Sequence, residues 1–184
     1  MRATSRPSRS TTRARASRPE AVPAAPPGLP AFLADRMLIR LARWLRAAGY
    51  DTATAEDGRV DRALMEAAVR EDRLLLTCDR KLAEFRAAPG RVVILPAAGV
   101  AGTARALTLR CGIDWLHRPF SRCLVCNVPV EAAAVAEAWP ADRVWREAFQ
   151  PLTRCPDCGR LYWQGGHVAR MRARLERWRR GDFG

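Results

Sequence analysis

The chain has 184 residues, of which 48% are hydrophobic, enough for one ordinary domain plus a small module. No run reaches the roughly 20 apolar residues of a membrane-spanning helix, and the N-terminus lacks the apolar core of a secretory signal, so we expect no membrane association and no export. The net charge of +13 arises from 32 basic residues against 19 acidic ones. This charge favours a polyanionic partner, although heavy arginine usage also reflects genome composition.

Residues 1–29 differ in composition from the rest of the chain. They are rich in Arg, Ser, Thr, Ala and Pro, and Glu20 is their only acid. Such a segment buries too little apolar surface to offset the entropy lost on ordering. We therefore predict a disordered basic tail, with an organelle transit peptide or a misassigned start codon as the alternatives.

From Ala31 onward, short apolar runs alternate with helical patterns. Strands are predicted at 32–34, 51–55, 74–77 and 92–95, and helices at 36–48, from Asp61, at 81–86 and at 102–111. Strands that alternate with helices imply right-handed crossovers and a mostly parallel sheet. We expect an α/β domain over residues 30–116.

The first predicted helix has two distinct faces. Its buried face is predicted to carry Met37, Leu38, Leu41, Leu45 and Ala48. The opposite face carries Arg36, Arg40 and Arg43, which are candidates for binding phosphates, with a solvated helix face as the plainer alternative.

Two aspartates follow apolar strands, where an α/β sheet displays its ligand-binding groups. Asp35 comes directly after the first strand and Asp79 two residues after Thr77. With Asp61 they make a candidate set for Mg²⁺ or Mn²⁺ in phosphodiester hydrolysis, because such an ion activates water and neutralises phosphate charge. Each aspartate could instead cap a helix or turn. Weaker candidates are Asp51, Glu56, Asp57 and Glu66.

Four of the six cysteines form two CxxC pairs. These pairs are Cys123 with Cys126 and Cys155 with Cys158, whereas the other two cysteines stand alone. In a chain without an export signal, paired CxxC spacing indicates metal binding in a reducing compartment, which favours the cytoplasm. Four thiolates close the tetrahedral shell of zinc, so this zinc is predicted to be structural.

The second module is predicted over residues 117–184. It consists of a zinc ribbon followed by a basic helix at 168–180, whose apolar stripe is expected to pack on the ribbon. Three aromatic residues, Trp44, Tyr162 and Trp163, are candidates for stacking on bases, although aromatic residues near a zinc knuckle more often serve packing.

The sequence resembles the Mut7-C RNase family, a branch of the PIN-like nucleases. The resemblance is carried by FLADRMLIRLARWLRAAGYD at 32–51, LLLTCDR at 74–80, RCLVCN at 122–127 and CPDCGRLYWQGGH at 155–167. It implies a PIN-like three-layer α/β sandwich with a C-terminal zinc ribbon, and a metal-dependent ribonuclease activity. PIN-like enzymes place acids at positions that Asp35 and Asp79 match, with Asp61 as our choice for the middle acid. Cys78 stands where relatives often have a basic residue.

Together these features predict a cytoplasmic ribonuclease with RNA as its substrate. Mg²⁺ or Mn²⁺ would be held by Asp35, Asp61 and Asp79, and Zn²⁺ by the four paired cysteines. The alternatives are a non-catalytic module that binds RNA or a ribosome, whose binding weakens steeply with salt, and a protein-interaction adaptor built on the ribbon.

Overall fold

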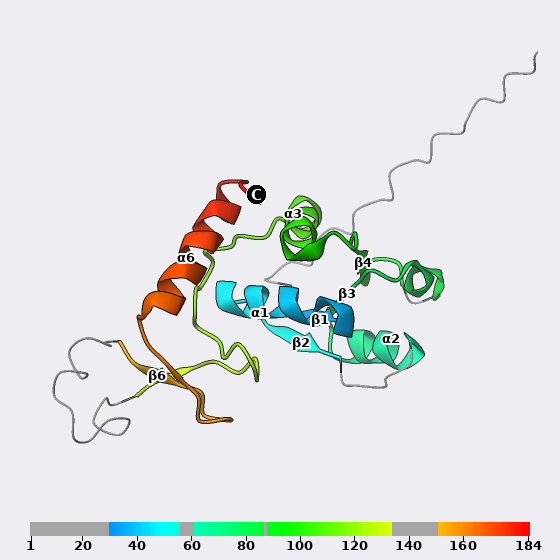
Figure 1. Ribbon diagram of the computed structural model, residues 1–184. Helices are drawn as coiled ribbons and strands as arrows, with labels where there is room; N and C mark the ends of the chain where they lie inside the picture. The colour runs from blue at the N-terminus through cyan, green and yellow to red at the C-terminus, as the bar shows by residue number, and fades with distance from the viewer. Residues whose placement is uncertain (1–29, 56–60, 87, 134–150) are drawn as a thin grey trace, which may run out of the picture.

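The computed structural model describes residues 30–55, 61–86, 88–133 and 151–184. The predicted tail lies outside these residues. The described part contains a four-stranded and a three-stranded sheet with helices packed around them (Figure 1).

The larger sheet is parallel throughout, as the alternating pattern predicts. Its strands are β1 (Phe32–Ala34), β2 (Thr52–Thr54), β3 (Leu74–Thr77) and β4 (Val92–Ile94), in the order β2-β1-β3-β4. The neighbours β1 and β3 lie at its centre and are buried on both faces, which explains their unbroken apolar sequences.

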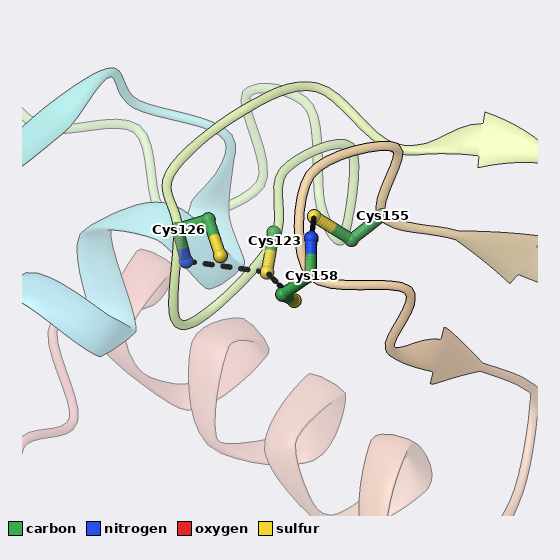
Figure 2. Close-up of side chains that lie close together, drawn as sticks. All are labelled: Cys123, Cys126, Cys155 and Cys158. Carbon is green, nitrogen blue, oxygen red and sulfur yellow. Dashed lines mark hydrogen bonds between the residues drawn. The ribbon is translucent and has the colours of Figure 1, made fainter.

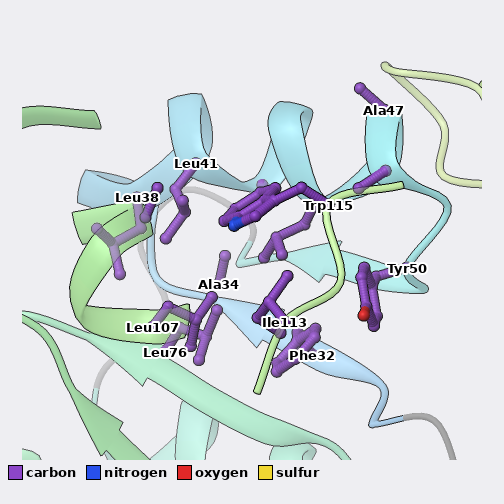
Figure 3. Packing of buried hydrophobic residues seen from close by; sticks show 14 of the residues in the cluster. Phe32, Ala34, Leu38, Leu41, Ala47, Tyr50, Leu76, Leu107, Ile113 and Trp115 are labelled. Carbon is purple, nitrogen blue, oxygen red and sulfur yellow. The ribbon is translucent and has the colours of Figure 1, made fainter. Parts of the chain in front are cut away.

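Helices cover both faces of this sheet and make three layers. The elements are η1 (Arg36–Leu38), α1 (Ile39–Ala48), α2 (Asp61–Arg70), the 3₁₀ helix η2 (Arg80–Glu84) and α3 (Gly99–Cys111). Side chains alternate along the strands, so Phe32 and Leu76 join a cluster with α1 and α3, whereas Leu33 and Leu75 join one with α2 and η2. Figure 3 shows the first cluster, with Trp115 between α1 and the sheet.

The prediction that Met37 lies on the buried face of the first helix is wrong. The side chain of Met37 is 60% exposed, whereas those of Leu38 and Leu41 are 4% and 1% exposed. The helix opens with the 3₁₀ turn η1, whose three residues per turn change the angular position of Met37 relative to an α-helix. The predicted helix at 81–86 likewise forms only the 3₁₀ helix η2.

The second sheet is small and antiparallel. Its strands are β5 (Glu131–Ala132), β6 (Thr153–Arg154) and β7 (Leu161–Tyr162), in the order β5-β6-β7. Such short strands bury little apolar surface, so this module needs a staple such as a bound metal.

The C-terminal helix α6 (Gly166–Arg179) packs in a different place from the one its sequence suggested. Its buried residues Met171, Leu175 and Trp178 join the cluster formed by α1 and α3. Trp178 lies against Trp44 and Trp115, with ring centroids 5.0 and 4.7 Å away. Figure 1 shows α6 beside α1. The last helix therefore completes the core of the α/β domain.

Candidate functional site

The two strand-end aspartates lie at the same edge of the parallel sheet. Asp35 follows β1 and Asp79 follows β3, and these strands are hydrogen-bonded neighbours. The backbone N–H of Asp35 donates to the carbonyl of Leu76 at 2.9 Å, which extends the pairing to the residue that carries the carboxylate. Sheet register thus brings together two acids 44 residues apart in sequence.

Thr77 connects the two aspartates through its hydroxyl group. Its Oγ1 donates to Oδ2 of Asp35 at 2.7 Å and accepts from the backbone N–H of Asp79 at 3.0 Å. The threonine side chain is fully buried. Because this hydroxyl is fixed by both partners, it sets the orientation of the Asp35 carboxylate.

The two carboxylates differ in their local roles. The side chain of Asp79 caps η2, since Oδ1 accepts from the backbone N–H of Lys81 at 2.9 Å. Asp35 precedes η1 but makes no capping hydrogen bond with its side chain. Helix capping therefore accounts in part for an aspartate at position 79, but it does not account for an aspartate at position 35. Each carboxylate also retains one oxygen without a hydrogen bond in the described part of the chain.

The remaining candidate acids come from other elements of the fold. Asp61 is the first residue of α2 and is exposed, and Glu66 on the same helix is paired with Arg62 at 2.9 Å. Asp51 precedes β2, at the opposite end of the strands, and is bound by Arg73. The candidates Glu56 and Asp57 lie outside the described residues.

The three predicted metal-binding aspartates do not form a compact set. Across the described residues, the four paired cysteines are the sole group of three or more acidic, thiol or imidazole ligands within 4.8 Å of one another. The side chains of Asp35 and Asp79 provide the hard oxygen donors that Mg²⁺ and Mn²⁺ prefer, so the donor chemistry fits such an ion. The assignment of all three aspartates to it stays a prediction.

The surroundings of the aspartate pair combine exposed arginines with a half-buried thiol. Arg36, Arg40 and Arg43 are exposed on η1 and α1, beginning directly after Asp35, as the helical pattern predicts. Cys78 packs against the core, and burial, aided by the negative charge of Asp35, raises the pKa of its thiol. Cys78 is therefore a neutral neighbour of the acids.

The second candidate centre is the group of four cysteines, which we call the cysteine cluster. Figure 2 shows Cys123 and Cys126 on one loop and Cys155 and Cys158 on another, with their sulfurs pointing toward a common centre. Zinc bound at about 2.3 Å by four sulfurs requires sulfur–sulfur distances of about 3.8 Å. The Sγ atoms of Cys123 and Cys158 lie 3.8 Å apart. The four residues therefore fit a closed tetrahedral zinc site.

Backbone N–H groups support negative charge on these sulfurs. Sγ of Cys123 accepts from the N–H groups of Val125 at 3.4 Å and Cys126 at 3.3 Å, and Sγ of Cys155 accepts from the N–H of Cys158 at 3.4 Å. Burial raises the pKa of Cys123, but these hydrogen bonds and one with the Tyr162 hydroxyl outweigh it and lower the pKa to about 6. A thiolate, the form that binds zinc, is thus favoured at this position.

Both CxxC loops use one backbone pattern with a different residue at the critical turn. In each loop the N–H of the fourth residue after the first cysteine donates at 3.0 Å to that cysteine's carbonyl. This fourth residue has a positive φ, 71° at Gly159 and 70° at Asn127. Glycine and asparagine are the residues that tolerate this conformation best. Gly159 thus forms a tight turn directly after the second cysteine pair.

Asn127 also explains why the first loop does not use glycine. Its Oδ1 accepts from the backbone N–H of Thr52 on the edge strand β2 at 2.9 Å, and its Nδ2 donates to Oδ1 of Asp51 at 2.8 Å. The side chain therefore joins the cysteine cluster to the edge of the parallel sheet.

Arg46 makes a second connection that the sequence analysis missed. It is 4% exposed, and its guanidinium donates to the carbonyls of Thr52 at 2.8 Å, Leu124 at 3.1 Å and Val125 at 2.7 Å. Two of these carbonyls lie between Cys123 and Cys126. The available signal was its position next to the buried Leu45, on the apolar side of α1 rather than in the exposed arginine stripe.

Comparison with known proteins bears on both centres. The family model of the Mut7-C RNAse domain matches residues 30–175, which include the aspartate pair and all four clustered cysteines. No curated protein and no solved structure matches the chain. The match covers well over half of the 184 residues. The chain belongs to the Mut7-C RNAse domain family, which indicates a nuclease-like function with RNA as the substrate.

Proposed function

We propose that the protein is a metal-dependent ribonuclease whose reaction centre contains Asp35 and Asp79, with Asp61 as the third acid. One observation carries the proposal. The hydroxyl of Thr77 is hydrogen-bonded to Asp35 and to Asp79, at the ends of two strands, and it orients the carboxylate of Asp35, which caps no helix. Buried hydrogen bonds that fix an acid at the carboxyl edge of a parallel sheet are typical of a ligand-binding position.

In this proposal, some residues bind the metal ion and others position the acids or the substrate. Asp35 and Asp79, with Asp61, would hold Mg²⁺ or Mn²⁺. Such an ion, when bound, supplies an activated water and offsets charge on the phosphate. Thr77 keeps the Asp35 carboxylate in one orientation, which lowers the entropy cost of assembling the site. Arg36 and Arg40 would hold the phosphates of the substrate beside the acids.

The cysteine cluster has a separate role in this proposal. A closed set of four thiolates leaves no coordination position for water, so the zinc would be structural. We assign residues 30–116 to the nuclease domain and 117–184 to the ribbon and the basic helix α6 that follows it, although α6 packs on the nuclease domain. None of the six cysteines, all of which lie in the described ranges, forms a disulfide, and we propose a reducing location in the cytoplasm. None of the helices in the described ranges is both long and apolar enough to span a membrane.

The test is cleavage of a labelled, mixed-sequence single-stranded RNA by the full chain in Mn²⁺. Asp79→Asn keeps the size of the side chain and a capping oxygen for η2, and we expect turnover to fall by at least two orders of magnitude because metal affinity is lost. The matched control is Asp182→Asn, an exposed acid near the C-terminus, which should cut at the parent rate. Equal turnover by parent and Asp79→Asn protein would overturn the assignment.

A second candidate function is RNA binding without catalysis. It is favoured by one observation, the lack of a compact set of three acids among the described residues. It predicts that neither protein cuts RNA, while both bind it equally, without a divalent ion and with a steep salt dependence.

A further inference from the structure

Two adjoining cavities lie along α6, and we call them together the α6 groove. The first, of about 640 Å³, lies between the zinc ribbon and the start of α6, and its walls include Phe120, Tyr162 and Trp163. The second, of about 370 Å³, lies between α1 and α6 and includes Trp44. His167 and Met171 line both cavities, so the two adjoin each other.

Arginines line both cavities, three of them in the second and one in the mostly apolar first. Arg170, Arg174 and Arg177 line the second cavity and Arg160 lines the first, whereas no Asp or Glu of the described residues lines either one. The guanidinium of Arg174 lies over the ring of Trp44, 5.3 Å from its centroid, which limits its motion. The groove therefore favours an anionic ligand.

The ribbon end of the groove also contains a partly exposed aromatic ring. Trp163 is 38% exposed, unusually high for a tryptophan, and Val125 beside it is 49% exposed. The indole lies close against Gly165: a Cβ on that glycine would come within 2.7 Å of Nε1. Glycine at this position therefore lets the ring lie against the backbone at the wall of the cavity.

We propose that the α6 groove binds a single-stranded RNA segment, with a base stacked on Trp163 and neighbouring phosphates on Arg170 and Arg174. A polyanion with flat apolar bases matches an arginine-lined groove that ends in an exposed aromatic ring. The inference rests on RNA being the substrate, and it adds a binding site separate from the aspartates.

The groove and the aspartate pair are joined by one helix. Trp44 lies nine residues after Asp35, roughly 14 Å along η1 and α1. The exposed Arg40 and Arg43 lie between them on the same helix. An RNA strand held in the groove would pass over these arginines to reach the acids, so only substrates of several nucleotides would contact both places.

The experiment measures binding of a fluorescently labelled 12-nucleotide oligouridine to the full-length Asp79→Asn protein, with no Mg²⁺ or Mn²⁺ added. Trp163→Ala should weaken binding roughly tenfold or more, whereas Trp163→Phe should retain most of it because a stacking ring remains. Arg174→Ala should also weaken binding and reduce the salt slope by about 0.7, the value for one phosphate contact on a single strand.

Two control variants remove similar groups elsewhere. Leu109→Ala removes a 73% exposed apolar side chain from α3, and Arg105→Ala removes an exposed arginine from the same helix. Neither residue lines the groove, so both variants should bind like the parent. A fully paired RNA duplex should lose little affinity on Trp163→Ala, since its bases are not available for stacking.

The outcomes separate this proposal from the nuclease assignment. Equal binding by the parent, Trp163→Ala and Arg174→Ala proteins would overturn the proposal that the α6 groove binds RNA, even if the wild-type protein cuts RNA. Loss of binding in those variants supports the groove, even if the wild-type protein cuts nothing. If Trp163→Ala fails to fold, as judged by its thermal transition and zinc content, the exposed Arg174→Ala decides on its own.

Discussion

The cysteine cluster and the aspartate pair reach their geometry by different routes. Each CxxC loop is built by local backbone hydrogen bonds that direct two sulfurs to one side, so only the meeting of two loops is tertiary. Asp35 and Asp79 meet because β1 and β3 pair in one register and Thr77 bonds to both. The four sulfurs therefore lie together as a zinc site requires, whereas Asp35 and Asp79 are brought to one sheet edge and oriented through Thr77.

This difference matches the demands on the two centres. A structural zinc contributes to folding and benefits from a complete, rigid shell. A reaction centre must leave coordination positions and space for a phosphate and water. Four variants would test this difference between the two centres through their effects on stability.

The largest effect is expected from Cys155→Ser. Cys155 is fully buried, and its sulfur accepts a backbone hydrogen bond, so a hydroxyl there would abolish tight zinc binding. Loss of a structural metal site typically costs more than 4 kcal/mol, which corresponds to a drop of about 10 °C or more in Tm. Calorimetry with zinc analysis checks this, and Cys111→Ser, outside the cluster, should retain full zinc. A zinc-free protein with an unchanged Tm would show that the cluster is not structural.

The next largest effect is expected from Arg46→Met. The change keeps the length and apolar contacts of the side chain but leaves the carbonyls of Thr52, Leu124 and Val125 without their donor. Unsatisfied buried carbonyls of this kind should cost about 3 kcal/mol in the free energy of unfolding. Urea denaturation measures it. The exposed Arg43→Met is the matched control, with an expected change within about 0.5 kcal/mol. Equal stability of the two variants would mean that Arg46 does not brace the ribbon.

The effect of Thr77→Val should appear on both activity and stability. Valine has the same shape but removes the hydroxyl that bonds to Asp35 and to the N–H of Asp79. We expect a loss of about 1–3 kcal/mol in the free energy of unfolding. If the nuclease assignment holds, kcat should fall roughly tenfold or more because Asp35 is no longer held. Thr103→Val on α3 is the control, since that hydroxyl bonds only to carbonyls of its own helix. Normal kcat in Thr77→Val would remove Thr77 as a positioning residue.

The smallest effect is expected from Asp51→Asn, and it should depend on pH. Burial raises the pKa of the Asp51 carboxyl, but hydrogen bonds from Arg73 and Asn127 outweigh it and hold the pKa below its usual value. A lowered pKa stabilises the fold above the unfolded-state value, and that contribution disappears as pH falls through the folded-state value.

The parent should therefore exceed Asp51→Asn by about 1 kcal/mol at pH 7, a modest figure because the carboxylate is 34% exposed. The difference should shrink as pH falls below about 5. Urea denaturation at pH 7, 5 and 3 measures it. A difference that grows toward low pH would contradict the sign of the shift.

Much of the fold was readable from the sequence because its signals are local. Apolar runs predicted three strands of the parallel sheet, the segment 51–55 was predicted as the fourth, and paired cysteine spacing predicted the cluster. Met37 was assigned to the wrong face because a single 3₁₀ turn changes the angular position of a residue, and periodicity assumes a uniform helix. The C-terminal helix was assigned to the ribbon because an apolar stripe does not reveal which surface it covers.

The sequence by itself determined the succession of strands and helices along the chain, the residues that follow β1 and β3, and the four cysteines of the cysteine cluster. These follow from side-chain periodicity and from spacings of a few residues, which are local properties of the chain. Tertiary structure alone decided that Arg46 and Asn127 tie the ribbon to β2, that Thr77 joins Asp35 to Asp79, and that α6 forms a groove with α1 and the ribbon. Each depends on contacts between segments distant in sequence, where burial and unsatisfied hydrogen-bonding groups select the partner.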